Sequence, residues 1–205
     1  MCNRGRMTLA AVLENSFVRL EPLEERHREP LRAVGAEPEL WRFHPLNHFN
    51  ANFDGWFDHY LKGSANGAEQ CWAVLEKASG RYAGSTSYLL ASNIPMPFRK
   101  VEIGSTWYGK SFWAGAVNPS CKRLLFAFGF EGLGLNRVEL KLDATNIRSF
   151  RAVARLGARF EGIHRAHMVM PDGRIRDTAW FSVLKDEWPA VRDGLDARLA
   201  KFAVS

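Results

Sequence analysis

The chain has 205 residues and a net charge of +6, with 46% hydrophobic and 24% charged residues, a composition typical of a globular protein. No apolar run approaches the roughly 20 residues that a membrane helix needs, so no membrane partner is expected. The widely spaced Cys2, Cys71 and Cys121 exclude a disulfide framework and offer no metal-ligand spacing, which predicts a reducing, cytoplasmic setting and no bound metal.

The length favours one domain. We expect residues 1–15 to be a flexible lead-in, too early interrupted by Glu14 to be a signal peptide, and residues 16–205 to form a single domain. The positive charge suits any polyanion, including nucleic acid, a membrane surface or a phosphorylated cofactor. Because the basic residues are dispersed among acidic ones, no nucleic-acid partner is expected.

The first third of the chain predicts a strand and three helical segments, at 17–23, 24–35, 38–43 and 53–63. Pro30 is an awkward interruption of the first helix. The polar loop 44–52 between the last two helices carries Pro, His and Asn, so it is a plausible substrate-facing surface.

The rest of the chain predicts six strands, three helices and one strong turn. In chain order these are the hairpin strands 71–77 and 82–92, strand 100–108, helix 119–133, strand 137–142, helix 147–156, strands 159–170 and 174–184 around the turn Pro171-Asp172-Gly173, and helix 186–202. Asp186 is a candidate N-cap of the last helix, where Pro189 is tolerated in the first turn. This order predicts a mixed α/β fold and disfavours a doubly wound sheet.

A small-residue loop stands between strand 100–108 and the following helix. It contains Ala114-Gly115-Ala116, after which Asn118 is expected at the N-cap and Pro119 at the first helical position. Free backbone N–H groups at a helix start favour an anion, and Lys122 and Arg123 add positive charge. The alternative is a tight turn before a capped helix that binds nothing.

Three segments carry a family resemblance: VRLEPL, EIGSTWYGKSFWAGAVNPSCKRLLFAFGFEGLGLNRVELKLDATNIRSFRAVARLGARFEG and PDGRIRDTAWFSVLKDEWP. They resemble the GNAT superfamily of N-acetyltransferases, in its ribosomal-protein-alanine acetyltransferase (RimJ/RimL-like) branch, over most of residues 17–189. The resemblance implies a curved, mixed, mostly antiparallel sheet flanked by helices, with a V-shaped opening between the fourth and fifth strands. It also implies that acetyl-coenzyme A, the co-substrate, enters that opening.

The same resemblance implies the cofactor contacts. They fall on Ser105, Thr106, Trp107, Ala114, Gly115, Ala116, Val117, Asn118, Lys122 and Asn146. The sequence departs from the family pattern at Trp113, where Gln or Arg is usual, and at Ala116, where Gly is usual. It also has Val153 where many members use a tyrosine to protonate the leaving thiolate.

Acetyl transfer to an amine needs a group that takes the amine proton and a group that stabilises the thiolate. Glu102 is the candidate base, because strand alternation places it on one face with Gly104 and Thr106. Its alternative role is a surface carboxylate paired with Lys100 or Arg137. Ser149 is the candidate donor to the sulfur, or else an ordinary first-turn serine in a helix that Asn146 caps.

The function expected from these residues is acetyl transfer from acetyl-coenzyme A to a primary amine, of a protein N-terminus or a small molecule, by direct attack. The alternative is a non-catalytic acyl-coenzyme-A-binding module of the same fold, which Trp113 and Ala116 favour. Histidines are further proton acceptors, although hydrogen-bonding roles are expected for His44, His48, His164 and His167. The protein is expected to be a monomer or homodimer.

Overall fold

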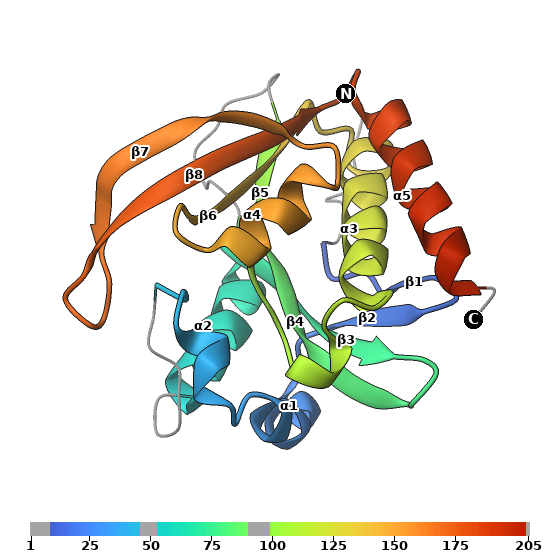
Figure 1. The fold of residues 1–205 in the computed structure, drawn as a ribbon. Coiled ribbons are helices and arrows are strands. Elements are labelled where there is room, and N and C mark those ends of the chain that lie inside the picture. Colours follow the sequence, from blue (N-terminus) through green and yellow to red (C-terminus); the bar gives the residue numbers. More distant parts are fainter. Residues whose placement is uncertain (1–8, 46–52, 90–98, 204–205) are drawn as a thin grey trace, which may run out of the picture.

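The computed structural model describes residues 9–45, 53–89 and 99–203 (Figure 1). Its centre is one mixed, open sheet of eight strands in the order β1-β2-β3-β4-β5-β6-β8-β7. The strands are β1 Leu13–Glu14, β2 Val18–Pro22, β3 Glu69–Glu76, β4 Arg81–Leu89, β5 Lys100–Tyr108, β6 Arg137–Asp143, β7 Arg159–Val169 and β8 Ile175–Leu184. Every neighbouring pair is antiparallel except β5 and β6, which confirms the predicted fold class.

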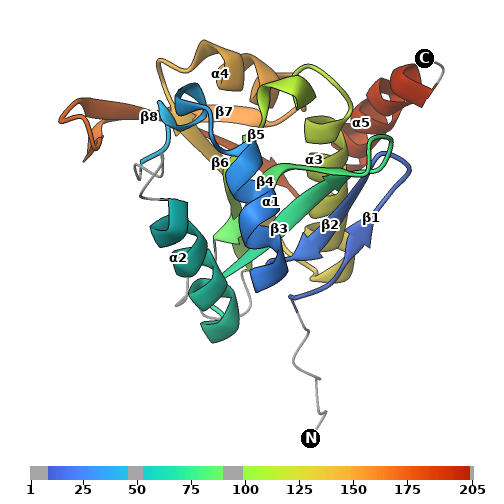
Figure 2. The same ribbon diagram turned by 90° about the horizontal axis from the view of Figure 1, so that it is seen from below.

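Helices cover both faces of the sheet. They are α1 Arg28–Val34, α2 Phe53–Asn66, α3 Val117–Ala127, α4 Ile147–Ala154 and α5 Trp188–Ala203, with short 3-10 turns at Glu25–His27, Pro38–Trp41 and Lys110–Phe112. Figures 1 and 2 show α3 and α5 side by side, with α1 and α2 on the other side of the first four strands. The predicted loop 44–52 lies outside the described residues from position 46 onward, as do the last three residues of predicted strand 82–92.

Two apolar cores result, one on each face. Residues of β5 alternate between them, so Val101 and Ile103 enter the core beneath α3 and α5. Trp107 instead enters the aromatic core beneath α1 and α2, where it contacts Trp41 and Trp56. The burial of these rings confirms that most of the tryptophans anchor the core.

Several predicted helix boundaries are wrong, and the prolines show why. Pro30 does not interrupt a helix, because α1 begins only at Arg28 and the proline occupies its first turn, where a missing N–H costs nothing. Helix α3 likewise begins at Val117 with Ala116 at the N-cap, so Asn118 is not the cap and Pro119 is not the first residue. Asp186 is not a cap either, since α5 begins at Trp188. The helical segment after Ala127 continues as a π-helical turn, Phe128–Gly132.

The end of the expected lead-in takes part in the sheet. Leu13 and Glu14 pair with β2 as the edge strand β1, and the indole of Trp72 donates a 2.8 Å hydrogen bond to the Ala11 carbonyl. The extra strand shifts the numbering, so the predicted fourth and fifth strands are β5 and β6.

Candidate active site

Strands β5 and β6 separate after a short contact. Only Lys100, Val101 and Glu102 pair with β6, opposite Arg137, Val138 and Glu139. Beyond Glu102 the described residues of β5 pair with β4 alone, while the rest of β6 pairs with β8. The sheet therefore carries a V-shaped opening lined by backbone N–H and C=O groups that have no strand partner, which is where an extended amide-bearing chain would find hydrogen bonds.

A β-bulge lies in β5 at the opening. Ser85 and Ser87 of β4 are opposite Trp107 and Gly104, so β5 has one residue more than its partner between these pairs. Ser105 takes up the extra length with φ 46°. The bulge reverses the alternation, so the prediction that Thr106 shares a face with Glu102 and Gly104 is wrong.

Thr106 faces α3. Its hydroxyl lies 2.8 Å from that of Thr86 and accepts a 3.0 Å hydrogen bond from the ammonium group of Lys122. Lys122 is only 4% exposed, and burial lowers its pKa to about 8. The Lys122 charge is thus held between α3 and β5. The prediction that it adds positive charge to an anion site at the start of the helix is not supported by this position.

The loop that leads into α3 is shaped by three residues. Trp113 donates from its indole to the Tyr108 carbonyl at 2.7 Å, and the Arg148 guanidinium lies 3.5 Å from the centre of its ring. Ala114 adopts φ 62°, a left-handed conformation that favours glycine. Ala116 has φ −73°, so alanine at this departure from the family pattern fits without strain.

Backbone donors converge at the end of this loop. The first N–H groups of α3 have no partner within the helix, and Gly115 keeps its Cα side open, because an added Cβ would meet nothing closer than 3.9 Å. The helix dipole favours an anion there, and Arg148 stands beside the loop. The residues present therefore fit a pyrophosphate group at this helix start.

Glu102 is a buried carboxylate at the mouth of the opening. Its Oε2 lies 2.9 Å from the Nζ of Lys141, and its side chain is 12% exposed. Burial raises the pKa of Glu102, and the Lys141 charge opposes that effect in part. Lys100 and Arg137, the partners considered from the sequence, pair with Glu139 instead.

Gly104 keeps the other oxygen of Glu102 clear. A Cβ at Gly104 would lie 2.9 Å from Glu102 Oε1 and 2.6 Å from Leu89 Cδ1. Within the described part of the chain, the hydrogen-bonding partner of the carboxylate is Lys141, which holds Oε2, so Oε1 is the oxygen available to take a proton.

His44, from the loop predicted to face the substrate, and Tyr60, which the sequence did not assign to the site, meet at the bulge. The Ser105 hydroxyl lies 3.2 Å from Nε2 of His44, and Tyr60 of α2 also bonds to Ser105. Burial raises the pKa of Tyr60, which keeps its hydroxyl protonated. His44 and Tyr60 are 61 and 45 positions before Ser105, so no local motif joins them.

Helix α4 begins beside the opening, directly after β6. Asn146 caps it as predicted, accepting a 3.1 Å hydrogen bond from the Ser149 N–H. Ser149 is half-buried in the first turn. Val153, which stands where many family members have the tyrosine that protonates the thiolate, is buried in the core and its side chain points away from solvent.

The face of β6, β7 and β8 next to Glu102 carries aromatic and basic groups. The Trp180 ring has the Lys141 ammonium 5.5 Å from its centre and the His164 ring at 5.1 Å. His167 lies 3.0 Å from the Thr178 hydroxyl. His167 thus has the hydrogen-bonding role expected of it, whereas His164 makes ring contacts.

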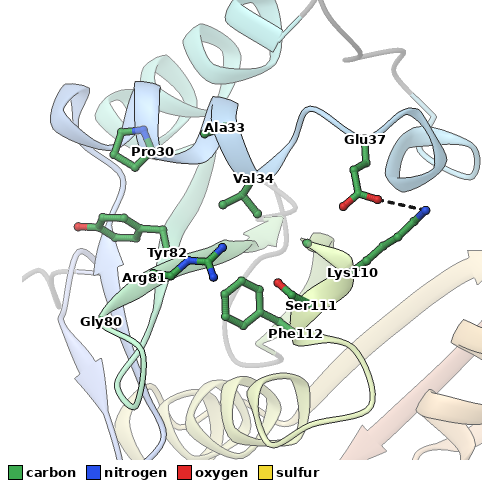
Figure 3. A pocket seen from close by; sticks show the side chains of 11 residues that line it. Pro30, Ala33, Val34, Glu37, Gly80, Arg81, Tyr82, Lys110, Ser111 and Phe112 are labelled. Carbon is green, nitrogen blue, oxygen red and sulfur yellow. Dashed lines mark ion pairs between the residues drawn. The ribbon is translucent and has the colours of Figure 1, made fainter.

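A separate cavity of about 440 Å³ lies between α1, the β3–β4 turn and the segment Gly109–Phe112 (Figure 3). Its charged groups are engaged with each other: Lys110 pairs with Glu37 at 3.1 Å and Glu39 at 2.6 Å. Arg81 lies 5.5 Å from the centre of the Phe112 ring. None of the candidate catalytic groups lines this cavity.

Metal-binding clusters and membrane-crossing helices are both absent from the described residues. In residues 9–45, 53–89 and 99–203, no group of three or more His, Cys, Asp and Glu is placed to hold a metal ion. No helix in the same ranges has the length and apolar character needed to cross a membrane.

The sequence matches the acetyltransferase (GNAT) domain family over residues 18–159. A putative ribosomal N-acetyltransferase, YdaF of Bacillus subtilis (strain 168), is 33% identical over 109 residues, 52% of this chain. That match spans 58% of the relative, less than two thirds of its length.

Solved structures resemble the whole chain. A GCN5-related N-acetyltransferase from Brucella melitensis has a TM-score of 0.84 and 34% identity, covering 94% of this chain and 87% of its own. A putative acetyltransferase from T. thermophilus has a TM-score of 0.78 and 37% identity, covering 92% and 96%. Mycobacterium smegmatis RimJ, solved in complex with CoA-disulfide, shares the fold at a TM-score of 0.78 and 16% identity, covering 93% and 96%.

Proposed function

Because this chain belongs to the GNAT family of acetyltransferases, we propose that it moves the acetyl group of acetyl-coenzyme A to a primary amine by direct attack. The acceptor is the N-terminus of a protein or a small-molecule amine. The B. subtilis relative is described as a putative ribosomal N-acetyltransferase, which supports a protein acceptor.

The observation that carries the proposal is the state of Glu102. The carboxylate is buried where β5 and β6 part, one oxygen is held by Lys141, and the other has no donor in the described part of the chain. A base works best when its pKa lies near the working pH, and burial moves the pKa of Glu102 in that direction. Glu102 then takes the proton that the amine loses as its nitrogen bonds to the acetyl carbon.

The proposed cofactor contacts are those that the family resemblance implies, and the shape of the opening supports them. The backbone of Ser105 and Trp107 pairs with the pantetheine arm, and the N–H groups from Gly115 to Asn118 hold the pyrophosphate. The geometry of Lys122 supports an indirect role, because its bond to Thr106 fixes β5 from behind. When bound, acetyl-coenzyme A supplies the acyl group and the thiolate that leaves.

Ser149 is the proposed donor to the departing sulfur. It stands in the first turn of α4, near the positive end of the helix dipole, and the cap by Asn146 leaves its hydroxyl free to turn. The dipole and the hydroxyl both favour negative charge on the sulfur as its bond to carbon breaks. Glu102 would then release the proton that it received, directly or through solvent, to the departing thiolate.

The test has two measurements on the purified chain. Acetyl-coenzyme A and free coenzyme A, but not NAD, are expected to stabilise it against heat, by about 2.7 kcal/mol at a concentration 100 times the Kd. Amines are expected to release free thiol from acetyl-coenzyme A. Stabilisation without thiol release from any amine would leave the non-catalytic module, and no stabilisation at millimolar acetyl-coenzyme A would reject both.

A further inference from the structure

Arg176 on β8 is a buried cation that has no ion pair within the described residues. Its side chain faces the same side of the sheet as Thr178 and Trp180, and the residue is 3% exposed. Among residues 9–45, 53–89 and 99–203, no hydrogen bond or salt bridge reaches its guanidinium, and its Nε is fully buried and unpaired. A buried charge in this state is costly unless something pairs with it.

The two acids whose charges act on Arg176 are already matched by other cations. Asp143 accepts a 2.7 Å bond from Arg174 through one oxygen and bonds from Thr145 through the other. Glu102 is paired with Lys141. Asp143 and Glu102 act on Arg176 by their charges alone, without a hydrogen bond. Among the described residues this cluster therefore holds two anions, Asp143 and Glu102, and three cations. Arg174 and Lys141 pair with the anions, and Arg176 is the cation left over.

The surplus charge lies on the acceptor side of the opening. Glu102 is opposite Glu139 of β6, which is opposite Ser182 of β8, and Ser182 shares a face with Trp180 and Arg176. The phosphate-binding loop lies at the other end of β5, so the pyrophosphate is not the anion that matches Arg176. Trp180 adds a second donor that needs an oxygen, because its Nε1 is also buried and unpaired in the described residues.

We propose that Arg176 binds a carboxylate of the acceptor, so that the acetylated amine belongs to a molecule that also carries an acid group. Two oxygens of a carboxylate match the paired N–H groups of a guanidinium. Of the guanidinium nitrogens only Nε is both fully buried and unpaired in the described part of the chain, so a ligand would reach Arg176 through its terminal nitrogens. The inference rests on the proposed acetyl transfer and narrows its acceptor.

Matched amines test the proposal, with kcat/KM measured from thiol release. Alanine against alaninamide tests a free α-carboxylate, and alanyl-aspartyl-glycinamide against alanyl-asparaginyl-glycinamide tests an acidic side chain in a peptide. In one of the two pairs, kcat/KM is expected to be about 10- to 100-fold higher for the acid, mainly through a lower KM. A charge-assisted hydrogen bond supplies a difference of this size. Arg176→Gln is expected to abolish that preference by raising the KM for the acid to that for its neutral partner.

Arg165→Gln is the matched control, because Arg165 is an exposed arginine of β7. It is expected to leave the preference unchanged. Equal use of acid and amide by the wild-type chain, or a preference that survives Arg176→Gln, would overturn the proposal.

Two readouts do not depend on turnover. N-acetylalanine is expected to stabilise the wild-type chain against heat more than N-acetylalaninamide does, and Arg176→Gln is expected to lose the difference. If no amine releases thiol, acetyl transfer fails as the function, and this binding comparison alone decides whether Arg176 holds a carboxylate. Arg176→Met is expected to keep or raise the Tm, since it removes an unpaired buried charge; a large fall in Tm would make Arg176 structural and overturn the proposal.

Discussion

The Nζ of Lys141 lies 2.9 Å from Oε2 of Glu102, so an ion pair joins β6 to β5 at the point where the two strands stop pairing. The ammonium orients the carboxylate and offsets part of the effect of its burial. Both residues belong to strands of the core sheet, so the candidate base is held more firmly than a loop residue would be.

Replacing the candidate base tests its role directly. Glu102→Gln is expected to lower kcat about 10²- to 10⁴-fold, the usual contribution of a general base. Heat stabilisation by coenzyme A is expected to persist, because no cofactor contact is lost. Glu161→Gln is the control, since Glu161 is an ion-paired carboxylate of the outer strand β7 and is expected to leave kcat unchanged. A wild-type kcat in Glu102→Gln would remove Glu102 from the mechanism.

The pH dependence follows from the same pair. The base must be ionised, so kcat/KM is expected to fall as the pH drops through the pKa of Glu102, which burial places above the ordinary value of about 4.3. Lys141 lowers that pKa by its charge, so Lys141→Met is expected to move the acidic limb to higher pH. Lys141→Arg keeps the charge and is expected to leave the limb near its wild-type position. A limb that moves to lower pH in Lys141→Met would contradict this account.

The loop that leads into α3 stores backbone strain at Ala114. With φ 62°, Ala114→Gly is expected to raise the free energy of unfolding by about 1 kcal/mol, because glycine adopts this conformation without the steric cost. Ala127→Gly, in α3 with φ −60°, is expected to lower it by about 1 kcal/mol. Chemical denaturation measures both, and a loss of stability in Ala114→Gly would show that the loop does not keep this conformation.

Because Lys122 is buried, the free energy of unfolding is expected to change with pH in the alkaline range. Burial lowers its pKa from 10.5 to about 8, so between these values the unfolded chain binds more protons than the folded one. The free energy of unfolding therefore rises with pH across this window, by roughly 3 kcal/mol at 1.36 kcal/mol for each pKa unit. Lys122→Met is expected to lack the rise, whereas Lys185→Met, at an exposed lysine, is expected to keep it. Urea unfolding between pH 7 and pH 10.5 measures the free energy of unfolding of each variant. If that free energy rises with pH in Lys122→Met as it does in the wild type, the pH dependence does not come from Lys122.

Much of the fold could be predicted from local patterns. Alternation and turn residues locate every main strand, because the β3–β4 and β7–β8 hairpins carry strong turn signals at Ser79-Gly80 and Pro171-Asp172-Gly173. Helix starts are harder to predict. Pro119 suggests a first helical residue, but the first turn tolerates proline at later positions too, so the residue type alone leaves the start of α3 undetermined.

The site is predictable only where it is local in sequence. Asn146 is a cap because its partner Ser149 is three residues away. The bulge at Ser105 depends on the register of β5 against β4, which alternation in one strand cannot reveal. His44 and Tyr60 reach Ser105 from distant segments, so their positions follow only from the packing of the segment after Pro38–Trp41 and of α2 against β5.

In the described ranges three residue pairs join β5 to β6. The sheet therefore consists of two halves, β1 to β5 and β6 to β8, that are connected at one end. Beyond Glu102 the hydrogen bonds between the described strands of the two halves are missing. A ligand that carries amide groups, bound in the opening, would supply the missing hydrogen bonds and connect the two halves. Amide hydrogen exchange in the outer parts of β5 and β6 should therefore slow together when coenzyme A binds, although the two strands share no bond there. If the cofactor binds as proposed, it acts as an additional strand between β5 and β6.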